Sequence, residues 1–324
     1  SLNAANTPSF GTSTATADGF TVQISNYDAN FTYAGTATVG SVTIGVSGLV
    51  TVTGLSPNTS STVTITTARA NYASGSSPVT ATSLNAANTP SFGTSTATAD
   101  GFTVQISNYD ANFTYSGTAT AGGTVAISNT GLVTVIGVSA NTSVTATITT
   151  ARTNYVSGSA QVTATSLNAA NTPSFGASTA TADGFTVQIG NYDVNFTYGG
   201  TATVGSVSIN GSGLVTVTGV SPNTSSTATI TTNRTNYASG SAQVTATSLN
   251  AANTPSFGAS TATADGFTVQ ISNYDANFTY SGTAAAGGTV AISNTGLVTV
   301  IGVSANTSVT ATITTARTNY VSGS

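Results

Sequence analysis

The sequence predicts an all-β chain, a tandem array of four sandwiches of about seven antiparallel strands each. Three observations predict it. The segment SLNAANTPSF begins at Ser1 and returns at Ser83, Ser166 and Ser248. Short segments alternate apolar and polar residues, and no stretch has the apolar spacing of a helix. Units of about 82 residues exceed the roughly 20–50 residues of solenoid repeats, so each can enclose its own core. The predicted repeats are residues 1–82, 83–165, 166–247 and 248–324.

The strands of the first repeat are predicted from this alternation. Residues 19–25 place Phe20, Val22 and Ile24 on one face of a strand, where they can pack into a core. Residues 62–66 alternate in the same way, and residues 49–53 and 78–82 are rich in β-branched side chains. Turn-forming Gly, Pro, Asn and Asp residues separate these segments. Their spacing leaves room for about seven short strands in each repeat.

The composition excludes several functional classes. Only 4% of the residues are charged, and Lys, Glu, His, Cys, Met and Trp are all absent. With four cations and a net charge of −4, a nucleic-acid partner is not expected, because such binding depends on neutralising phosphates. Disulfides and thiolate metal sites are impossible, and an enzyme is not expected because general bases are almost absent. No apolar run is long enough to span a membrane.

Short strands at this spacing, without helices, are typical of an immunoglobulin-like sandwich. The segment Gly54-Leu55-Ser56-Pro57-Asn58-Thr59 resembles the turn before the sixth strand of fibronectin type III domains. The segment Gly131-Leu132-Val133 is similar to one in bacterial immunoglobulin-like repeats. The tyrosine that the fibronectin-type family carries after that turn is replaced here by Ser61, Val144, Ser226 and Val309. The resemblance to tandem modules of surface proteins and adhesins implies an immunoglobulin-like/fibronectin type III-like array located outside the cell.

The eight aspartates occupy two positions per repeat, one on each side of the strand at residues 19–25. Seven extended residues place them more than about 20 Å apart, at opposite ends of the sandwich. Aspartates of successive repeats can therefore meet across a junction. Calcium is possible there, although Asp is also an ordinary turn residue. The candidate calcium pairs are Asp18 with Asp110, Asp100 with Asp193, and Asp183 with Asp275. No other cofactor is expected.

Two further groups of residues are candidates at the N-terminal end of each repeat. One arginine per repeat follows the strand that contains residues 62–66, where it could pair with an aspartate of its own repeat or of the preceding one. These arginines are Arg69, Arg152, Arg234 and Arg317. Tyr27, Asp28 and Tyr72 lie among turn residues and are candidate binding loops for a glycan or a protein, although the rings could equally pack into the core.

Residues 83–90 connect the first two repeats, lack Gly and end in Pro90, which indicates a semi-rigid joint. Four sandwiches joined in this way would form a rod on the order of 100–150 Å long. The expected function is therefore structural, a stalk or fibre segment of an extracellular surface protein that projects a functional tip. The alternatives are a multivalent glycan- or protein-binding array and a fibre of a virus or phage.

The fourth repeat stops before a counterpart of residues 160–165 and is expected to lack its last strand. We expect the sequence to be a segment of a longer protein for this reason. The alternative is a filament subunit whose open fourth sandwich accepts a strand from another copy of the chain. Neighbouring repeats of the same chain are the expected partners in the first case, and other copies in the second.

Overall fold

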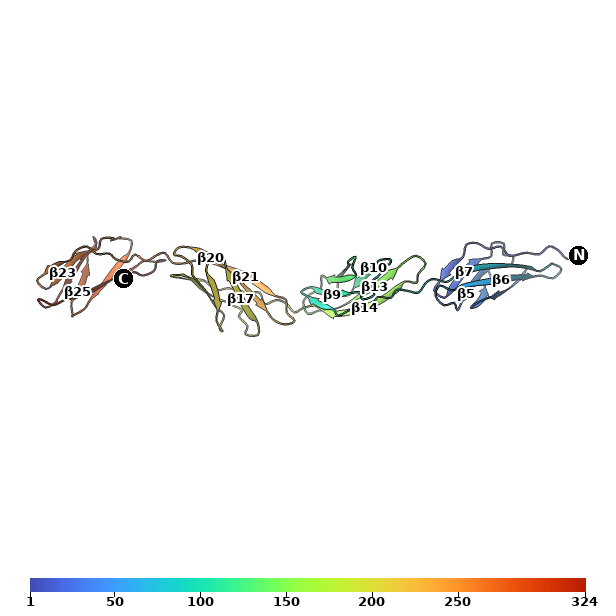
Figure 1. Cartoon of the computed structure of the whole chain (residues 1–324), viewed down its shortest axis with the longest axis horizontal. Helices are drawn as coiled ribbons and strands as arrows, with labels where there is room; N and C mark the ends of the chain where they lie inside the picture. The colour runs from blue at the N-terminus through green and yellow to red at the C-terminus, as the bar shows by residue number, and fades with distance from the viewer. The chain divides into compact units, whose positions relative to one another are not determined.

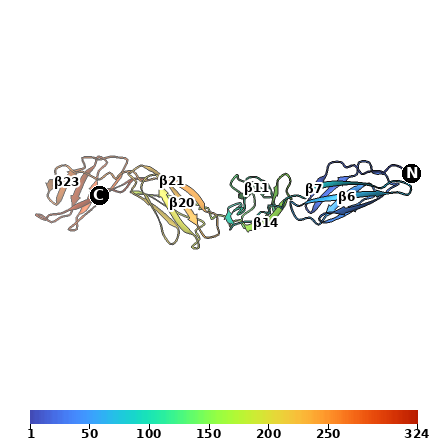
Figure 2. The same cartoon turned by 45° about the vertical axis from the view of Figure 1, so that its right-hand side comes forward.

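The computed structural model describes all 324 residues, and every regular element in it is a strand (Figures 1 and 2). The chain forms two compact units, Ser1–Ala169 and Ala170–Ser324, and each unit contains two of the repeats. Each repeat has its own apolar core. The chain forms no helix that is long and apolar enough to cross a lipid bilayer.

The first three repeats have seven strands each, and the fourth has six. The first contains β1 (Thr14–Thr16), β2 (Gly19–Gln23), β3 (Thr32–Ala37), β4 (Ser41–Ile44), β5 (Leu49–Thr53), β6 (Ser60–Ala68) and β7 (Gly75–Thr82). The second contains β8 (Thr96–Thr98), β9 (Gly101–Gln105), β10 (Thr114–Ala119), β11 (Thr124–Ile127), β12 (Leu132–Ile136), β13 (Ser143–Ala151) and β14 (Gly158–Thr165). The third contains β15 (Thr179–Thr181), β16 (Gly184–Gln188), β17 (Thr197–Ala202), β18 (Ser206–Ile209), β19 (Leu214–Thr218), β20 (Ser225–Asn233) and β21 (Gly240–Thr247). The fourth contains β22 (Thr261–Thr263), β23 (Gly266–Gln270), β24 (Thr279–Ala284), β25 (Thr289–Ile292), β26 (Leu297–Ile301) and β27 (Ala311–Ala316).

The strands of each complete repeat form two antiparallel sheets. In the first repeat the sheet orders are β1-β2-β5-β4 and β3-β6-β7, and the second and third repeats have the same orders. The fourth strand pairs with the fifth, for example Val42 with Val52. This is the four-plus-three arrangement of a constant-type immunoglobulin sandwich. The prediction of tandem immunoglobulin-like sandwiches of about seven strands is confirmed.

Alternation along the strands places the core as predicted. Phe20, Val22 and Ile24 are at most 1% exposed, and Val63 and Ile65 of the opposite sheet are fully buried. The residues between them, such as Thr21 and Thr64, lie on the other face of each sheet, and the exposed positions of β7 carry Ser, Pro and Thr. Burying one large aliphatic or aromatic side chain stabilises the fold by about 1.5–3 kcal/mol, so these alternating residues supply most of the driving force for each sandwich.

The first and second repeats differ at the position where the tyrosine of fibronectin type III domains is missing, which is Ser61 in the first and Val144 in the second. In the first repeat Ser61 is buried, and its hydroxyl donates to the Val39 carbonyl at 2.8 Å and accepts from the Val39 amide at 3.3 Å. In the second repeat the loop that faces this position is one residue longer and turns through Ala121 and Gly122, both with positive φ. Val144 fills the position and is fully buried. The side chain at this position therefore matches the length of the loop above it.

The fourth repeat has a smaller second sheet, in which β24 pairs only with β27. β27 has six residues, whereas its counterpart β13 has nine, because residues 308–310 have no neighbouring strand to pair with. Phe267 is only half-buried, although its counterpart Phe185 is fully buried. The third strand of this sheet thus completes both the hydrogen-bond ladder and the cover of the core in the other repeats.

Candidate functional site at the N-terminal end of each repeat

The segment that leads into each repeat is bound to that repeat by a network of asparagines. In the second repeat the Asn108 side-chain amide donates to the Asn88 side-chain oxygen and to the Thr89 carbonyl, both at 2.8 Å. The Ser91 amide donates to the Asn108 side-chain oxygen at 2.8 Å. The buried Thr150 hydroxyl donates to the Asn88 carbonyl at 2.7 Å and accepts from the Gly158 amide at 3.1 Å. Residues 88–91 therefore belong to the fold of the second repeat.

The joint between the first two repeats is consequently very short. The Leu84 amide donates to the Thr16 carbonyl and the Leu84 carbonyl accepts from the Asn58 amide, both at 2.9 Å, so Leu84 is held by the first repeat. The next residue, Asn85, is held by the second repeat. Its amide donates to the Asn154 carbonyl at 2.8 Å, and its carbonyl accepts from the Val156 amide at 3.0 Å. Consecutive residues are thus bonded to different repeats.

The prediction of a joint extending over residues 83–90 is therefore wrong in its length. Only the link between Leu84 and Asn85 lies outside both repeats. Backbone hydrogen bonds hold Leu84 to the first repeat and Asn85 to the second. The junction inside the second unit is built in the same way. There the Leu249 amide donates to the Thr181 carbonyl at 2.9 Å, and the Asn250 amide donates to the Asn319 carbonyl at 2.8 Å.

The Tyr27-type side chains are half-buried and pack against the core. The Tyr27 ring stacks on the Tyr33 ring with a centroid separation of 4.8 Å. Gly48 covers the same ring with φ of +79°, and a Cβ at this position would lie 2.5 Å from Tyr27. The Tyr33 hydroxyl accepts hydrogen bonds from the Asp28 amide at 2.9 Å and from the Asn6 side chain at 3.1 Å. These contacts support the alternative that the Tyr27 ring has a packing role.

The Asp28-type carboxylates close a turn on their own repeat. The Asp28 Oδ1 atom accepts from the Asn30 amide at 2.9 Å and from the Asn30 side chain at 2.7 Å. These hydrogen bonds hold the pKa of Asp28 below its ordinary value of 3.8, and the positive charge of Arg69 lowers it further. The same shift in pKa with the same causes occurs at Asp110, Asp193 and Asp275.

Each arginine lies over aromatic rings of its own repeat. The Arg152 Cζ atom is 4.6 Å from the centroid of Tyr155 and 5.5 Å from that of Phe113. The two rings meet edge to face with centroids 5.0 Å apart. Within each unit no arginine nitrogen comes within 4.0 Å of a carboxylate oxygen. The structure therefore records cation–π contacts where ion pairs were the expected interaction, and the junction ion pairs stay a prediction.

The predicted site residues divide between the two ends of the repeat. Asp28, Arg69 and Tyr72 lie at the N-terminal end, where Asn3 forms a bridge with Tyr72. Asp18 lies at the C-terminal end, since its carbonyl accepts from Leu55 and nearby Thr16 accepts from the departing Leu84. No group of three or more acidic, His or Cys side chains that could hold a metal ion is present. The calcium pairs across the junctions stay a prediction.

Comparisons with known proteins find only distant similarities, to solved structures. No model of a protein family matches the chain, and no curated protein matches it. Among solved structures it is similar to invasin, a bacterial integrin-binding protein, with 16% identity, a TM-score of 0.30, and coverage of 98% of this chain and 78% of that one. It is also similar to extracellular cadherin domains 3–6 of protocadherin gamma B2, with 13% identity, a TM-score of 0.24 and 95% coverage of both chains. A third similarity, with 10% identity and a TM-score of 0.26, is to the FN1–FN3 domains of chicken CNTN1, covering 76% of this chain and 99% of that one. The immunoglobulin-like assignment rests on the strand order and cores described above.

Proposed function

We propose that the chain is a structural segment of an extracellular surface protein, a stiff spacer that holds a functional tip away from its anchor. The observation that carries this proposal is the joint, in which Leu84 is bonded to one repeat and Asn85 to the next. A spacer transmits position only if its joints resist bending. A joint of one link allows rotation about the Leu84 ψ and Asn85 φ angles and little else.

The contrast with an ordinary linker supports a stiff joint. A flexible chain of n residues has a root-mean-square length of roughly 5–6 Å times the square root of n, and it samples many directions. Here the residues on both sides of the link are fixed by backbone hydrogen bonds of 2.8–3.0 Å. Bending beyond the freedom of the link must break these bonds, each worth about 0.5–1.5 kcal/mol.

The residue content of the repeats also supports a structural role. The chain has no His, Lys, Glu or Cys, so most side chains used as general bases and nucleophiles are absent. All twelve charged residues lie outside the strands, in the loops at the ends of the sandwiches. The outward sheet faces are uncharged and rich in Thr and Ser, a surface that keeps the repeats hydrated without long-range repulsion between neighbours.

Small-angle X-ray scattering of the full chain tests this proposal. The comparison variant carries Gly-Ser-Gly-Ser inserted between Leu84 and Asn85 and again between Leu249 and Asn250. We expect the natural chain to give scattering that a few closely related arrangements of the repeats describe. The variant should require a broad ensemble, because each insertion adds about four freely rotating residues. A natural chain that needs an ensemble as broad as that of the variant would contradict the spacer function.

A further inference from the structure

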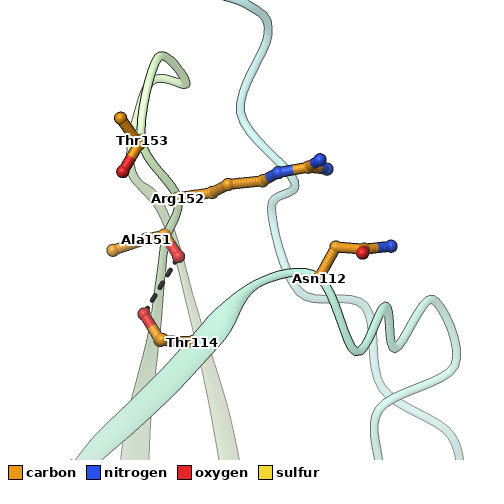
Figure 3. Close-up of a pocket in the computed structure, with 5 residues that line it drawn as sticks. All are labelled: Asn112, Thr114, Ala151, Arg152 and Thr153. Carbon is orange, nitrogen blue, oxygen red and sulfur yellow. Dashed lines mark hydrogen bonds between the residues drawn. The ribbon is translucent and has the colours of Figure 1, made fainter.

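A shallow pocket recurs at the same place in all four repeats. In the second repeat it measures about 520 Å³ and is lined by Asn112, Thr114, Ala151, Arg152 and Thr153. The corresponding pockets of the first, third and fourth repeats measure about 390, 420 and 510 Å³. Figure 3 shows the Arg152 and Asn112 side chains extending to the same side from the adjoining ends of β13 and β10.

The arginine in this pocket is positioned but has unused donors. Contacts with the Tyr155 and Phe113 rings hold the face of its guanidinium group. The chain supplies no acceptor for its N–H groups within either unit. A planar guanidinium presents five N–H donors in a fixed geometry that matches an oxyanion such as a carboxylate. Stacking on a ring lowers the entropy lost when such a group binds, because the side chain is already ordered.

Other groups beside Arg152 are also free to bind. The Asn112 side-chain nitrogen is used by Asp110, but its oxygen accepts no hydrogen bond within the chain. The Thr153 hydroxyl has no partner in the chain, whereas the Thr114 hydroxyl donates to the Ala151 carbonyl at 2.9 Å. The pocket therefore combines one cation with an acceptor and a hydroxyl. An acidic sugar carries a carboxylate and several hydroxyls, and it can use all three groups.

The positive charge of Arg152 is balanced by a nearby carboxylate, and this balance determines how strongly one pocket can bind an anion. The Asp110 carboxylate lies on the same side of the repeat, is engaged with Asn112, and attenuates the attraction of Arg152 for an anion. The Asp100 carboxylate lies at the other end of the second repeat, beyond the Debye length of about 8 Å at physiological salt, whereas Asp18 of the first repeat lies at the junction beside the end that carries the pocket. A single pocket should therefore bind weakly. Several weak pockets on one chain gain affinity when one polymer reaches more than one of them.

We propose that each repeat binds an acidic sugar residue in this pocket, and that the four pockets together bind an acidic polysaccharide. The arginine binds the carboxylate through two N–H groups, and the Asn112-type oxygen and Thr153-type hydroxyl bind sugar hydroxyls. In the first repeat Ala70 stands where Thr153 stands in the second. Ser74 also lines the first pocket, so a hydroxyl is present there at a different position from that of Thr153. Binding in the four pockets requires no change in the fold of the repeats.

The test measures binding of the full chain to immobilised hyaluronan, a polymer with one carboxylate per disaccharide, by surface plasmon resonance. The matched surfaces are carboxyl-reduced hyaluronan and poly-glutamate. We expect binding to hyaluronan and at least tenfold weaker binding to the other two. Equal binding to poly-glutamate would assign the pockets to acidic peptides and overturn the proposal. Absence of measurable binding to the immobilised hyaluronan would also overturn it.

Variants of the arginines distinguish binding in the pockets from binding elsewhere on the surface. Replacing all four arginines by Gln should abolish binding to hyaluronan, and replacing them by Lys should weaken it about three- to tenfold, because Lys keeps the charge and loses the two-point contact. The Lys variant also keeps a cation over the rings, so it controls for folding. Retention of full binding by the Gln variant would refute the assignment.

Discussion

The Thr150 hydroxyl is the buried link between the incoming segment and the sandwich of the second repeat. It donates to the Asn88 carbonyl at 2.7 Å and accepts from the Gly158 amide at 3.1 Å, and the side chain is 1% exposed. The substitution Thr150→Val keeps the shape and removes both hydrogen bonds. It leaves the Asn88 carbonyl without its hydrogen-bond donor, whereas the Gly158 amide keeps its place in the ladder opposite Thr150.

The cost follows from the loss of this donor. A buried polar group left unsatisfied destabilises a protein by about 1–3 kcal/mol, a large part of the roughly 5–15 kcal/mol that stabilises a typical domain. For a domain of about 80 residues, 1 kcal/mol corresponds to about 4–8 °C in Tm. A loss of about 2 kcal/mol therefore lowers the Tm of the second repeat by roughly 8–16 °C.

Differential scanning calorimetry of the full chain measures this shift. Thr150→Ser retains the hydroxyl and should recover most of the lost stability. Thr134→Val makes the same chemical change on the outward face of β12, where the Thr134 hydroxyl has no partner, and should change stability by less than about 0.5 kcal/mol. If Thr150→Val melts like the natural chain, or if Thr134→Val costs as much, the hydrogen bonds of Thr150 do not anchor the incoming segment.

Two further predictions concern the same end of the repeat. Gly131 and Gly137 have φ of +80° and +87°, but only a Cβ at Gly131 would meet a ring, 2.6 Å from Tyr109. We expect Gly137→Ala to cost about 1 kcal/mol and Gly131→Ala at least about 2 kcal/mol more in chemical denaturation; equal costs would show that Tyr109 does not pack there. The lowered pKa of Asp110 and its three counterparts stabilises the fold above their ordinary pKa of 3.8, and this stabilisation is lost as the pH falls through the lower folded value. Replacing these four aspartates by Asn should flatten the fall in Tm below about pH 4, and a fall of unchanged size in this variant would contradict the assignment.

The strands and the core were predictable because their signal is periodic. Alternation at Phe20, Val22 and Ile24 requires only that one face of a strand is buried, and the structure buries these residues. The opposite placement of the Asp18-type and Asp28-type residues was also predictable, because a strand of known length lies between them. Strands such as β4 were missed individually because they are short and half-exposed.

The joint was not predictable, since its contacts have no periodic signal. Asn88 and Asn108 lie twenty residues apart, and Asn is an ordinary turn residue, so nothing in the pattern indicates that their side chains meet. The ring contacts of the arginines depend on local geometry in the same way. The Tyr155 amide donates to the Arg152 carbonyl across a turn in which Asn154 has φ of +64°, and this turn brings the Arg152 side chain over the Tyr155 ring.

The stiffness of the Leu84–Asn85 link is tested most directly by a distance distribution between the first two repeats. The chain has no cysteine, so T43C and A126C can carry spin labels at exposed, equivalent positions of β4 and β11 in the full chain. Double electron–electron resonance should give a narrow distribution. Insertion of one Gly between Leu84 and Asn85 should broaden it, and the same insertion after Gly211, in an exposed turn of the third repeat, should not. A distribution in the natural chain as broad as that of the Leu84–Asn85 insertion variant would contradict a joint of one link.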